Sequence, residues 1–282
     1  MNIQLLLVPY DSGHRGWRCG AGPEHLLRAG LRGHLERLGH VVTAVQVLED
    51  DPAHHPAEIR TAFELARRLA HAVRSSRAVG HFPLVLSGNC NTAIGTLSGL
   101  SPALCATFWF DAHGDCNTPE TTTTGFLDGM GLATAIGLCW HDLVETVPGF
   151  QPVPPEITFL LGARDLDSAE AVWLGKSAVT AVSVEQLPGG LPLLLERAQI
   201  ADTVGYLHLD VDVLDPAVGR ANYLPVPHGL SLDQLTDAIA AIRDRVPLAA
   251  ATVASYSPEE DRDQGICRAA FAAIEAMVRG GA

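Results

Sequence analysis

The chain has 282 residues, of which 47% are hydrophobic and 18% charged, and its formal net charge is -13. A chain of this length buries enough apolar surface to fold without disulfides or a structural metal, and so low a charged fraction is not typical of a disordered chain. The negative charge excludes nucleic acid and anionic membrane surfaces as expected partners, because both would repel it.

The sequence also predicts where in the cell the protein is found. No apolar stretch reaches the roughly 18 residues that a membrane helix needs. The N-terminal run MNIQLLLVPY lacks a basic leader and is followed by Asp11, so we interpret it as a first strand and not as a signal peptide. Six cysteines in a chain of this length do not form a disulfide framework. We interpret four of them as buried thiols and expect a cytoplasmic protein: Cys19, Cys105, Cys139 and Cys267.

Short apolar runs alternate with segments of helical period along the chain. Strands are predicted at 4–8, 41–47, 82–87, 104–110, 157–161, 179–183, 204–209 and 249–255. Helices are predicted at 23–37, 56–77, 91–100, 129–138, 169–176 and 231–245, and a last helix begins near residue 265. This alternation is typical of an α/β domain with a parallel sheet between two helical layers. We find no repeat or linker, so residues 1–282 are predicted to form one domain.

Two of the predicted strands are followed by acids, and ligands of open parallel sheets bind beyond such strand ends. The segment DAHGD follows the strand at 104–110, and DVD follows the strand at 204–209. Alternate side chains leave an extended backbone on one side. Asp111, His113 and Asp115 are therefore predicted to converge, and Asp210 with Asp212 can meet them from a neighbouring strand end. The polar, Thr-rich segment 111–128 is predicted to be a long functional loop.

Carboxylates gathered at this spacing need a cation, because they would otherwise repel one another and some would stay protonated. Two divalent metals meet that need. Oxygen donors with one imidazole suit Mn, Mg or Fe better than a structural zinc. The alternative is that these acids are helix caps or solvated loop residues, which two acid-rich strand ends in one sheet disfavour.

The residues at these strand ends resemble a known family. DAHGDCN (111–117) and HLDVDVLDP (208–216) are similar to the two signature motifs of the ureohydrolases, the arginase and agmatinase family. The expected order and spacing continue in GAGPEHLLRAGL (20–31), LSGNCNTAIGTLSG (86–99), GARDLDSAE (162–170) and SYSP (255–258). The resemblance implies a single three-layer α/β domain with an eight-stranded parallel sheet. It also implies two Mn(II) ions bridged by a hydroxide that attacks a guanidino carbon.

The resemblance further implies which residues form the site. The ligands of metal A would be Cys90, Asp111, Asp115 and Asp210, and those of metal B would be Asp111, His113, Asp210 and Asp212. Asn117, Thr122 and Thr124 match positions that contact a substrate α-carboxylate, whereas Asp167 and Glu170 match positions that recognise an α-amino group. Hydroxyls and an amide suit a carboxylate, and acids suit an ammonium. A plain polar loop is the alternative for the threonines. The expected partner is a guanidino α-amino acid.

Three positions depart from the family pattern. Cys90 stands where a histidine is usual, and a thiolate would make metal A a weaker Lewis acid, although a metal-free buried thiol is the alternative. Asp128 replaces the histidine that shuttles a proton, and a carboxyl is a poor acid at neutral pH unless its surroundings raise its pKa. Ser255 replaces a glutamate that faces the guanidinium, which removes the charge partner of a cation.

These departures favour a substrate that is a weaker base than an ordinary guanidine. An ordinary guanidine is protonated at any pH below about 12. An N-hydroxyguanidine can bind neutral. The pattern resembles arginase relatives of D-cycloserine antibiotic biosynthesis that convert Nω-hydroxy-L-arginine to hydroxyurea and L-ornithine, and we expect that activity. The alternatives are an arginase, a hydrolase of another guanidino or formimino compound, and a metal-poor binding protein. Retention of five costly polar groups argues against the last.

Two further expectations concern the surroundings of the site. His14 and Trp17 lie in the loop after the first predicted strand and could close over the pocket, although a loop aromatic residue more often only packs. His208 and His228 are interpreted as structural. The chain carries no extended segment after its last predicted helix, so we expect a monomer.

Overall fold

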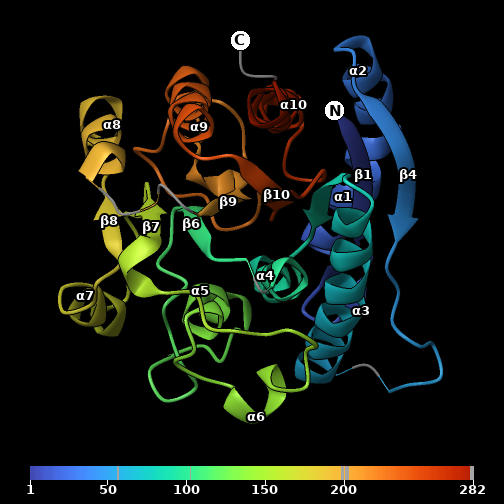
Figure 1. Cartoon of the computed structure of the whole chain (residues 1–282). Coiled ribbons are helices and arrows are strands. Elements are labelled where there is room, and N and C mark those ends of the chain that lie inside the picture. Colours follow the sequence, from blue (N-terminus) through green and yellow to red (C-terminus); the bar gives the residue numbers. More distant parts are fainter. Residues whose placement is uncertain (56, 102, 198–199, 201–202, 280–282) are drawn as a thin grey trace.

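The predicted strands form one parallel sheet in the computed structural model, which describes residues 1–55, 57–101, 103–197, 200 and 203–279. Its strand order is β4-β1-β5-β10-β9-β6-β7-β8 (Figure 1). The strands are β1 Asn2–Val8, β4 Val41–Val47, β5 Phe82–Ser87, β6 Cys105–Phe110, β7 Thr158–Leu161, β8 Thr180–Val182, β9 Val204–Asp210 and β10 Leu248–Ala254. A separate hairpin pairs β2, Tyr10–Asp11, with β3, His14–Arg15. All eight strands of the sheet were predicted to within two residues at each end, and the expected fold class is confirmed.

The helices differ more from the prediction. They are α1 Gly22–Arg28, α2 Leu31–Arg37, α3 Glu58–Ala78, α4 Ala93–Leu100, α5 Gly131–Ala135, α6 His141–Val144, α7 Ser168–Leu174, α8 Leu187–Arg197, α9 Leu232–Arg245 and α10 Gly265–Val278. The single helix predicted at 23–37 is wrong, because Gly30 has a left-handed φ of 100° that separates α1 from α2. The predicted start at residue 56 lies outside the described residues. Two helices were not predicted: α6, with 4 residues, and α8, with 11 residues.

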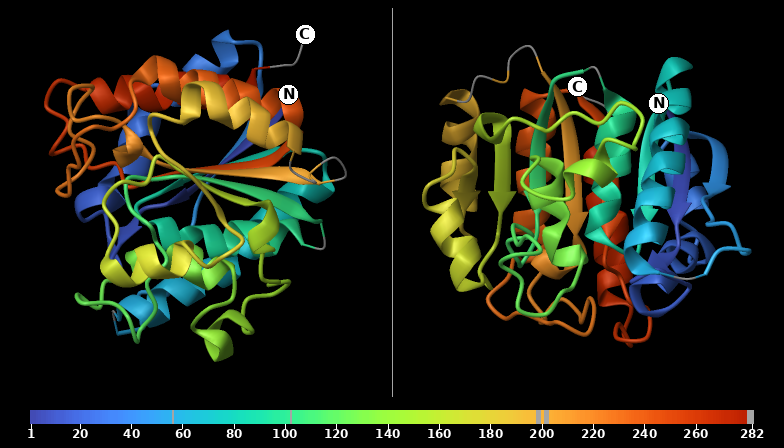
Figure 2. Two further views of the ribbon diagram at one scale, coloured as in Figure 1. Left: turned by 90° about the vertical axis from the view of Figure 1, so that its left-hand side faces the viewer. Right: turned by 90° about the horizontal axis from the view of Figure 1, so that it is seen from below.

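Helices cover both faces of the sheet, as Figure 2 shows from two sides. Along β1, Ile3, Leu5 and Leu7 point into the core beneath α1, α2, α8, α9 and α10. Leu6 and Val8 point the opposite way, into the core that α3, α4, α5 and α7 contribute to. Apolar side chains on both faces are typical of a parallel strand between two helical layers. Among the described residues, no helix is both long and apolar enough to cross a membrane.

The strand order determines which loops meet. β5, β10, β9 and β6 are consecutive neighbours at the centre of the sheet and run parallel, so their carboxyl ends share one edge. Phe110 of β6 is paired with Leu209 of β9, which brings Asp111 and Asp210 to the same height. Ala254 of β10 is paired with Asp210, so Ser255 follows beside it. The two acid-rich motifs, far apart in the sequence, therefore lie side by side.

Candidate metal centre

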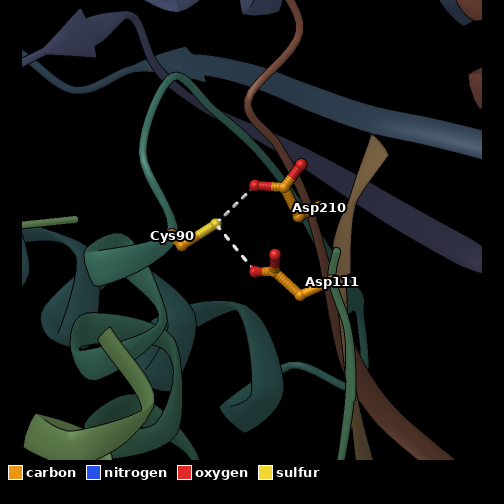
Figure 3. A group of neighbouring side chains, drawn as sticks. All are labelled: Cys90, Asp111 and Asp210. Carbon is orange, nitrogen blue, oxygen red and sulfur yellow. Dashed lines mark hydrogen bonds between the residues drawn. The ribbon is translucent and has the colours of Figure 1, made fainter. Parts of the chain in front are cut away.

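One group of metal-ligand atoms joins three of these strand ends (Figure 3). The Cys90 thiol lies in a 3-10 turn, Cys90–Thr92, that follows β5. Its Sγ is 3.0 Å from Asp210 Oδ2 and 3.9 Å from Asp111 Oδ2, and all three side chains are buried. Their ligand atoms lie within 4.8 Å of one another, a spacing that one metal ion can bridge. This group corresponds to part of the predicted metal A set.

A second group shares Asp111 with the first and adds His113 and Asp212. His113 Nδ1 lies 3.3 Å from Asp111 Oδ1 and 3.4 Å from Asp212 Oδ2. The imidazole is partly exposed, whereas both carboxylates are buried. Asp111 therefore stands between two candidate metal positions, as a bridging ligand would.

Asp115 joins the cluster by a route that the sequence did not reveal. Its backbone is left-handed, with a φ of 49°, so the prediction that an extended chain aligns Asp115 with Asp111 and His113 was wrong at this residue. The side chain is 6% exposed and lines the same cavity as His113. Within the described part of the chain, its Oδ2 atom has no hydrogen-bond partner. A buried carboxylate oxygen without a partner is costly unless a cation meets it.

The electrostatics of the cluster favour cation binding. Burial, and then the neighbouring aspartates, raise the pKa of Asp115 and of Asp210 well above the ordinary value. Burial and Asp210 likewise raise the pKa of the Cys90 thiol. Burial opposes protonation of His113, but hydrogen bonds to Asp111 and Asp212 outweigh it and raise the imidazole pKa. The cluster thus retains protons that divalent cations would displace, and its donor set of carboxylates, one imidazole and one thiol fits two such ions.

Two residues that the sequence analysis missed orient these ligands. Trp109 Nε1 donates to Asp111 Oδ2 at 3.2 Å, and Asn222 Nδ2 donates to Asp212 Oδ2 at 3.1 Å. Trp109 in turn stacks on His208, with ring centroids 3.8 Å apart. Burial lowers the pKa of His208 to about 3, so this imidazole is neutral and packs within the sheet. Trp109 lies two residues before Asp111, so alternation along β6 places both side chains on one side of the strand and could have indicated the contact. No local pattern in the sequence indicates Asn222.

Asp128 is buried in the cavity wall at the start of a 3-10 turn, Asp128–Met130. Its Oδ1 accepts from the Asn91 amide at 2.9 Å, and its Oδ2 accepts from Asn89 Nδ2 at 2.8 Å. Burial outweighs these hydrogen bonds and raises the pKa of Asp128 to about 8. The condition that the sequence analysis set for an acidic role at neutral pH is therefore met in the protein without metals.

The predicted carboxylate contacts lie in the same loop after β6 that carries His113 and Asp115. Thr122 Oγ1 accepts from the amides of Thr124 and Gly125, and Thr124 Oγ1 accepts from the Phe126 amide. In these bonds each hydroxyl is the acceptor, and both threonines line the cavity. Asn117 instead donates from Nδ2 to Asp167 Oδ2 at 2.8 Å, which ties the loop to α7.

The predicted ammonium contacts also stabilise a helix end. Asp167 and Glu170 form a capping box at the N-terminus of α7. Glu170 Oε2 accepts from the Asp167 amide and Oε1 from the Cys116 amide, both at 2.9 Å. Glu170 thus holds the loop that contains Cys116 against α7 and has little freedom to move. Both acids still line the cavity.

These side chains surround one cavity of about 260 Å³. Every predicted site residue except Asp111 lines it, and Asp111 is buried behind them. Ser255 has a left-handed φ of 64° and places its Oγ 3.4 Å from Cys90 Sγ. Asp11 and Asp165, which the sequence analysis did not select, also line the cavity. The pocket is strongly acidic and suits cations.

A family model for the arginase family matches residues 1–279. The chain belongs to the arginase family. It is 30% identical over 245 residues to the arginase of Bacillus caldovelox, covering 81% of this chain and 82% of that protein. It is 28% identical to the arginase of Brevibacillus brevis, over 98% of this chain and 97% of that one. The crystal structure of arginase from Bacillus subtilis strain 168 superposes with a TM-score of 0.88 at 26% identity, covering 100% and 99% of the two chains.

Membership in the arginase family makes this protein a metal-dependent hydrolase of the class that acts on guanidino groups.

Proposed function

We propose that this arginase-family protein is a binuclear manganese amidinohydrolase that converts Nω-hydroxy-L-arginine to hydroxyurea and L-ornithine. The observation that carries the proposal is Ser255, a neutral side chain at the end of β10 beside Cys90 and the metal-ligand cluster. A guanidinium ion is protonated at any ordinary pH and needs a carboxylate partner that remains free after the metals bind. Serine offers a neutral contact, which suits a substrate bound without charge.

The cluster residues would hold the two ions. Cys90, Asp111, Asp115 and Asp210 would form one ligand set, and Asp111, His113, Asp210 and Asp212 the other. When bound, two such ions supply an activated water near neutral pH and stabilise charge that develops at the guanidino carbon.

The protein's own side chains would orient the substrate and move a proton. Water adds to the guanidino carbon, and the bond from that carbon to the nitrogen on the side chain breaks. This nitrogen takes a proton as it leaves and becomes the δ-amino group of L-ornithine. Asp128 is the donor that we propose, because its pKa of about 8, raised by burial, keeps the carboxyl protonated at neutral pH. Thr122 and Thr124 would donate to the α-carboxylate, with Asn117 beside them. Asp167 and Glu170 would face the α-amino group.

L-Arginine is the second candidate substrate. The relatives and the superposed crystal structure are arginases, and this cavity offers threonine hydroxyls and carboxylates to an α-amino acid. Under this alternative, one of the cavity acids would have to replace the charge that Ser255 lacks.

Ornithine release from the Mn-loaded protein distinguishes the candidates, because both substrates give that product. We expect kcat/KM for Nω-hydroxy-L-arginine to exceed that for L-arginine by at least about tenfold, a difference of about 1.4 kcal/mol in transition-state stabilisation. Faster turnover of L-arginine would discard the hydroxyarginine proposal. Ser255→Glu should shift the preference toward L-arginine, whereas the matched Ser255→Ala variant should keep it. A manganese content of one ion per chain or less would contradict the binuclear centre, which requires two.

A further inference from the structure

A cation stands at the rim of the cavity, outside the metal-ligand cluster. The Arg18 guanidinium carbon lies 4.1 Å from the centroid of the Trp17 ring and 4.3 Å from that of the Tyr223 ring. The guanidinium therefore contacts two aromatic faces, which is a favourable arrangement for arginine. Burial raises the pKa of Tyr223 to about 12, so its ring stays a neutral phenol.

The neighbours of Arg18 place it at the cavity mouth. Cys19, the next residue, lines the cavity, and so does Tyr223. The Trp17 side is open to solvent, because 43% of that residue is exposed. The contact of Arg18 with Tyr223, which we call the Arg18 stack, thus connects the segment before α1 to the loop before α9 at one side of the cavity opening.

Arg18 differs from the other arginines around this site. Arg164 directs its Nε, Nη1 and Nη2 donors to five backbone carbonyls, which leaves none for a ligand. Arg220 is paired with Glu260 at 2.9 Å. Within the described ranges, Arg18 forms no ion pair. No lysine or arginine is among the described residues that line the cavity itself, whereas acids are frequent there.

The backbone of Arg18 is an additional sign of a constrained role. Its φ of 45° lies in the left-handed region, which is unfavourable for a side chain with a Cβ. Glycine would adopt this conformation without strain. A strained residue that persists at the rim of a site is a reason to look for a function there.

We propose that Arg18, which packs on Trp17 and Tyr223, binds the α-carboxylate of the amino-acid substrate at the cavity rim. This inference rests on the proposed function, in that the substrate is an α-amino acid. The hydroxyls of Thr122 and Thr124 can donate hydrogen bonds to a carboxylate but bring no positive charge into an acidic cavity. Arg18 supplies that charge, and its planar donor fork suits a carboxylate. It is a specificity residue, because it acts on the end of the substrate remote from the guanidino carbon.

Two probes that differ only in the carboxylate test the inference without turnover. L-Ornithine and putrescine are titrated calorimetrically into the Mn-loaded protein. The wild type should bind L-ornithine at least about tenfold more tightly. Arg18→Gly should weaken L-ornithine binding about tenfold and leave putrescine binding unchanged. Arg18→Lys should retain part of the preference, and Arg28→Ala, which removes an exposed arginine of α1, should retain all of it.

A purely structural role for the stack predicts a different pattern. Arg18→Gly would then lower the melting temperature and weaken both probes equally, and that result would overturn the proposal. We expect the melting temperature to stay equal or rise, because glycine suits the left-handed backbone. A wild type with no preference for L-ornithine would also overturn it. Absence of hydroxyarginine turnover alongside an Arg18-dependent L-ornithine preference would count against the proposed reaction only.

Discussion

The stability of the metal-free protein should fall as the pH rises from 5 to 8. Burial raises the pKa of Asp128 from an ordinary 3.8 to about 8. A carboxyl whose pKa is raised in the folded state stabilises that state fully below the unfolded pKa, and this contribution is lost as the pH rises through the folded pKa. Between pH 5 and 8 the folded chain therefore holds a proton that the unfolded chain has released.

The size of this change in the free energy of unfolding follows from the difference in bound protons between the folded and unfolded chains. One extra proton in the folded state changes the free energy of unfolding by about 1.4 kcal/mol per pH unit. Asp128 alone would lower it by about 4 kcal/mol over this range, which is a large part of the roughly 5–15 kcal/mol of a typical domain. Asp115 and Asp210, whose pKa values burial also raises, act in the same direction. Bound metals should remove the part of the decline that comes from Asp115 and Asp210, because they stabilise these ligand carboxylates in the ionised form, whereas Asp128, which is not a proposed ligand, keeps its proton.

Urea unfolding followed by tryptophan fluorescence measures this, with chelator and with Mn(II), at each pH unit. Asp128→Asn should make the slope in chelator shallower by about 1.4 kcal/mol per pH unit. Glu259→Gln removes an exposed acid and should leave the slope unchanged. A metal-free protein whose stability is flat or rises between pH 5 and 8 would refute the reasoning. So would an Asp128→Asn variant with the slope of the wild type.

Three further predictions concern single residues. Cys90→His should tighten Mn(II) binding at one of two sites in a metal titration without restoring turnover of L-arginine, and an unchanged affinity would argue against Cys90 as a ligand. Arg164→Met should lower the free energy of unfolding by about 3–5 kcal/mol, because it removes five hydrogen bonds from a half-buried guanidinium; Arg220→Met, at an exposed site, should cost less than about 1 kcal/mol. Gly88→Ala should cost about 2–4 kcal/mol in urea unfolding, because its Cβ would collide with the Tyr10 carbonyl, whereas Gly189→Ala meets open space and should be neutral or stabilising.

The strands were predictable because parallel strands buried on both faces are near-continuous apolar runs. The helices were harder where local chemistry conflicts with tertiary structure. α8 begins Leu-Pro-Gly-Gly, which resembles a turn, yet its leucines Leu187, Leu191 and Leu195 pack into the core. Tertiary burial outweighs the weak helix propensity of this segment.

The candidate site was predictable where residue type and strand ends coincide. Asp111, His113, Asp210 and Asp212 follow strands whose ends the alternation pattern locates, and the sheet brings them together. Asp115 needed a left-handed backbone that no spacing rule indicates. The remaining features depend on loops that meet only in three dimensions, such as the Arg18 stack on Tyr223.

The interleaved strand order has a consequence for the order of events during synthesis. β9 pairs with β6, and Ala112 contacts Asp212 across 100 residues of sequence. Asp210 and Asp212 leave the ribosome long after Cys90 and Asp111, so the early part of the chain carries an incomplete set of ligands. β9 then pairs with β6, and β10, the last strand to be made, enters the sheet between β5 and β9. If these residues hold the metals as proposed, metal loading is a late step that follows assembly of the sheet, and a truncated chain that lacks β9 would have an incomplete ligand set.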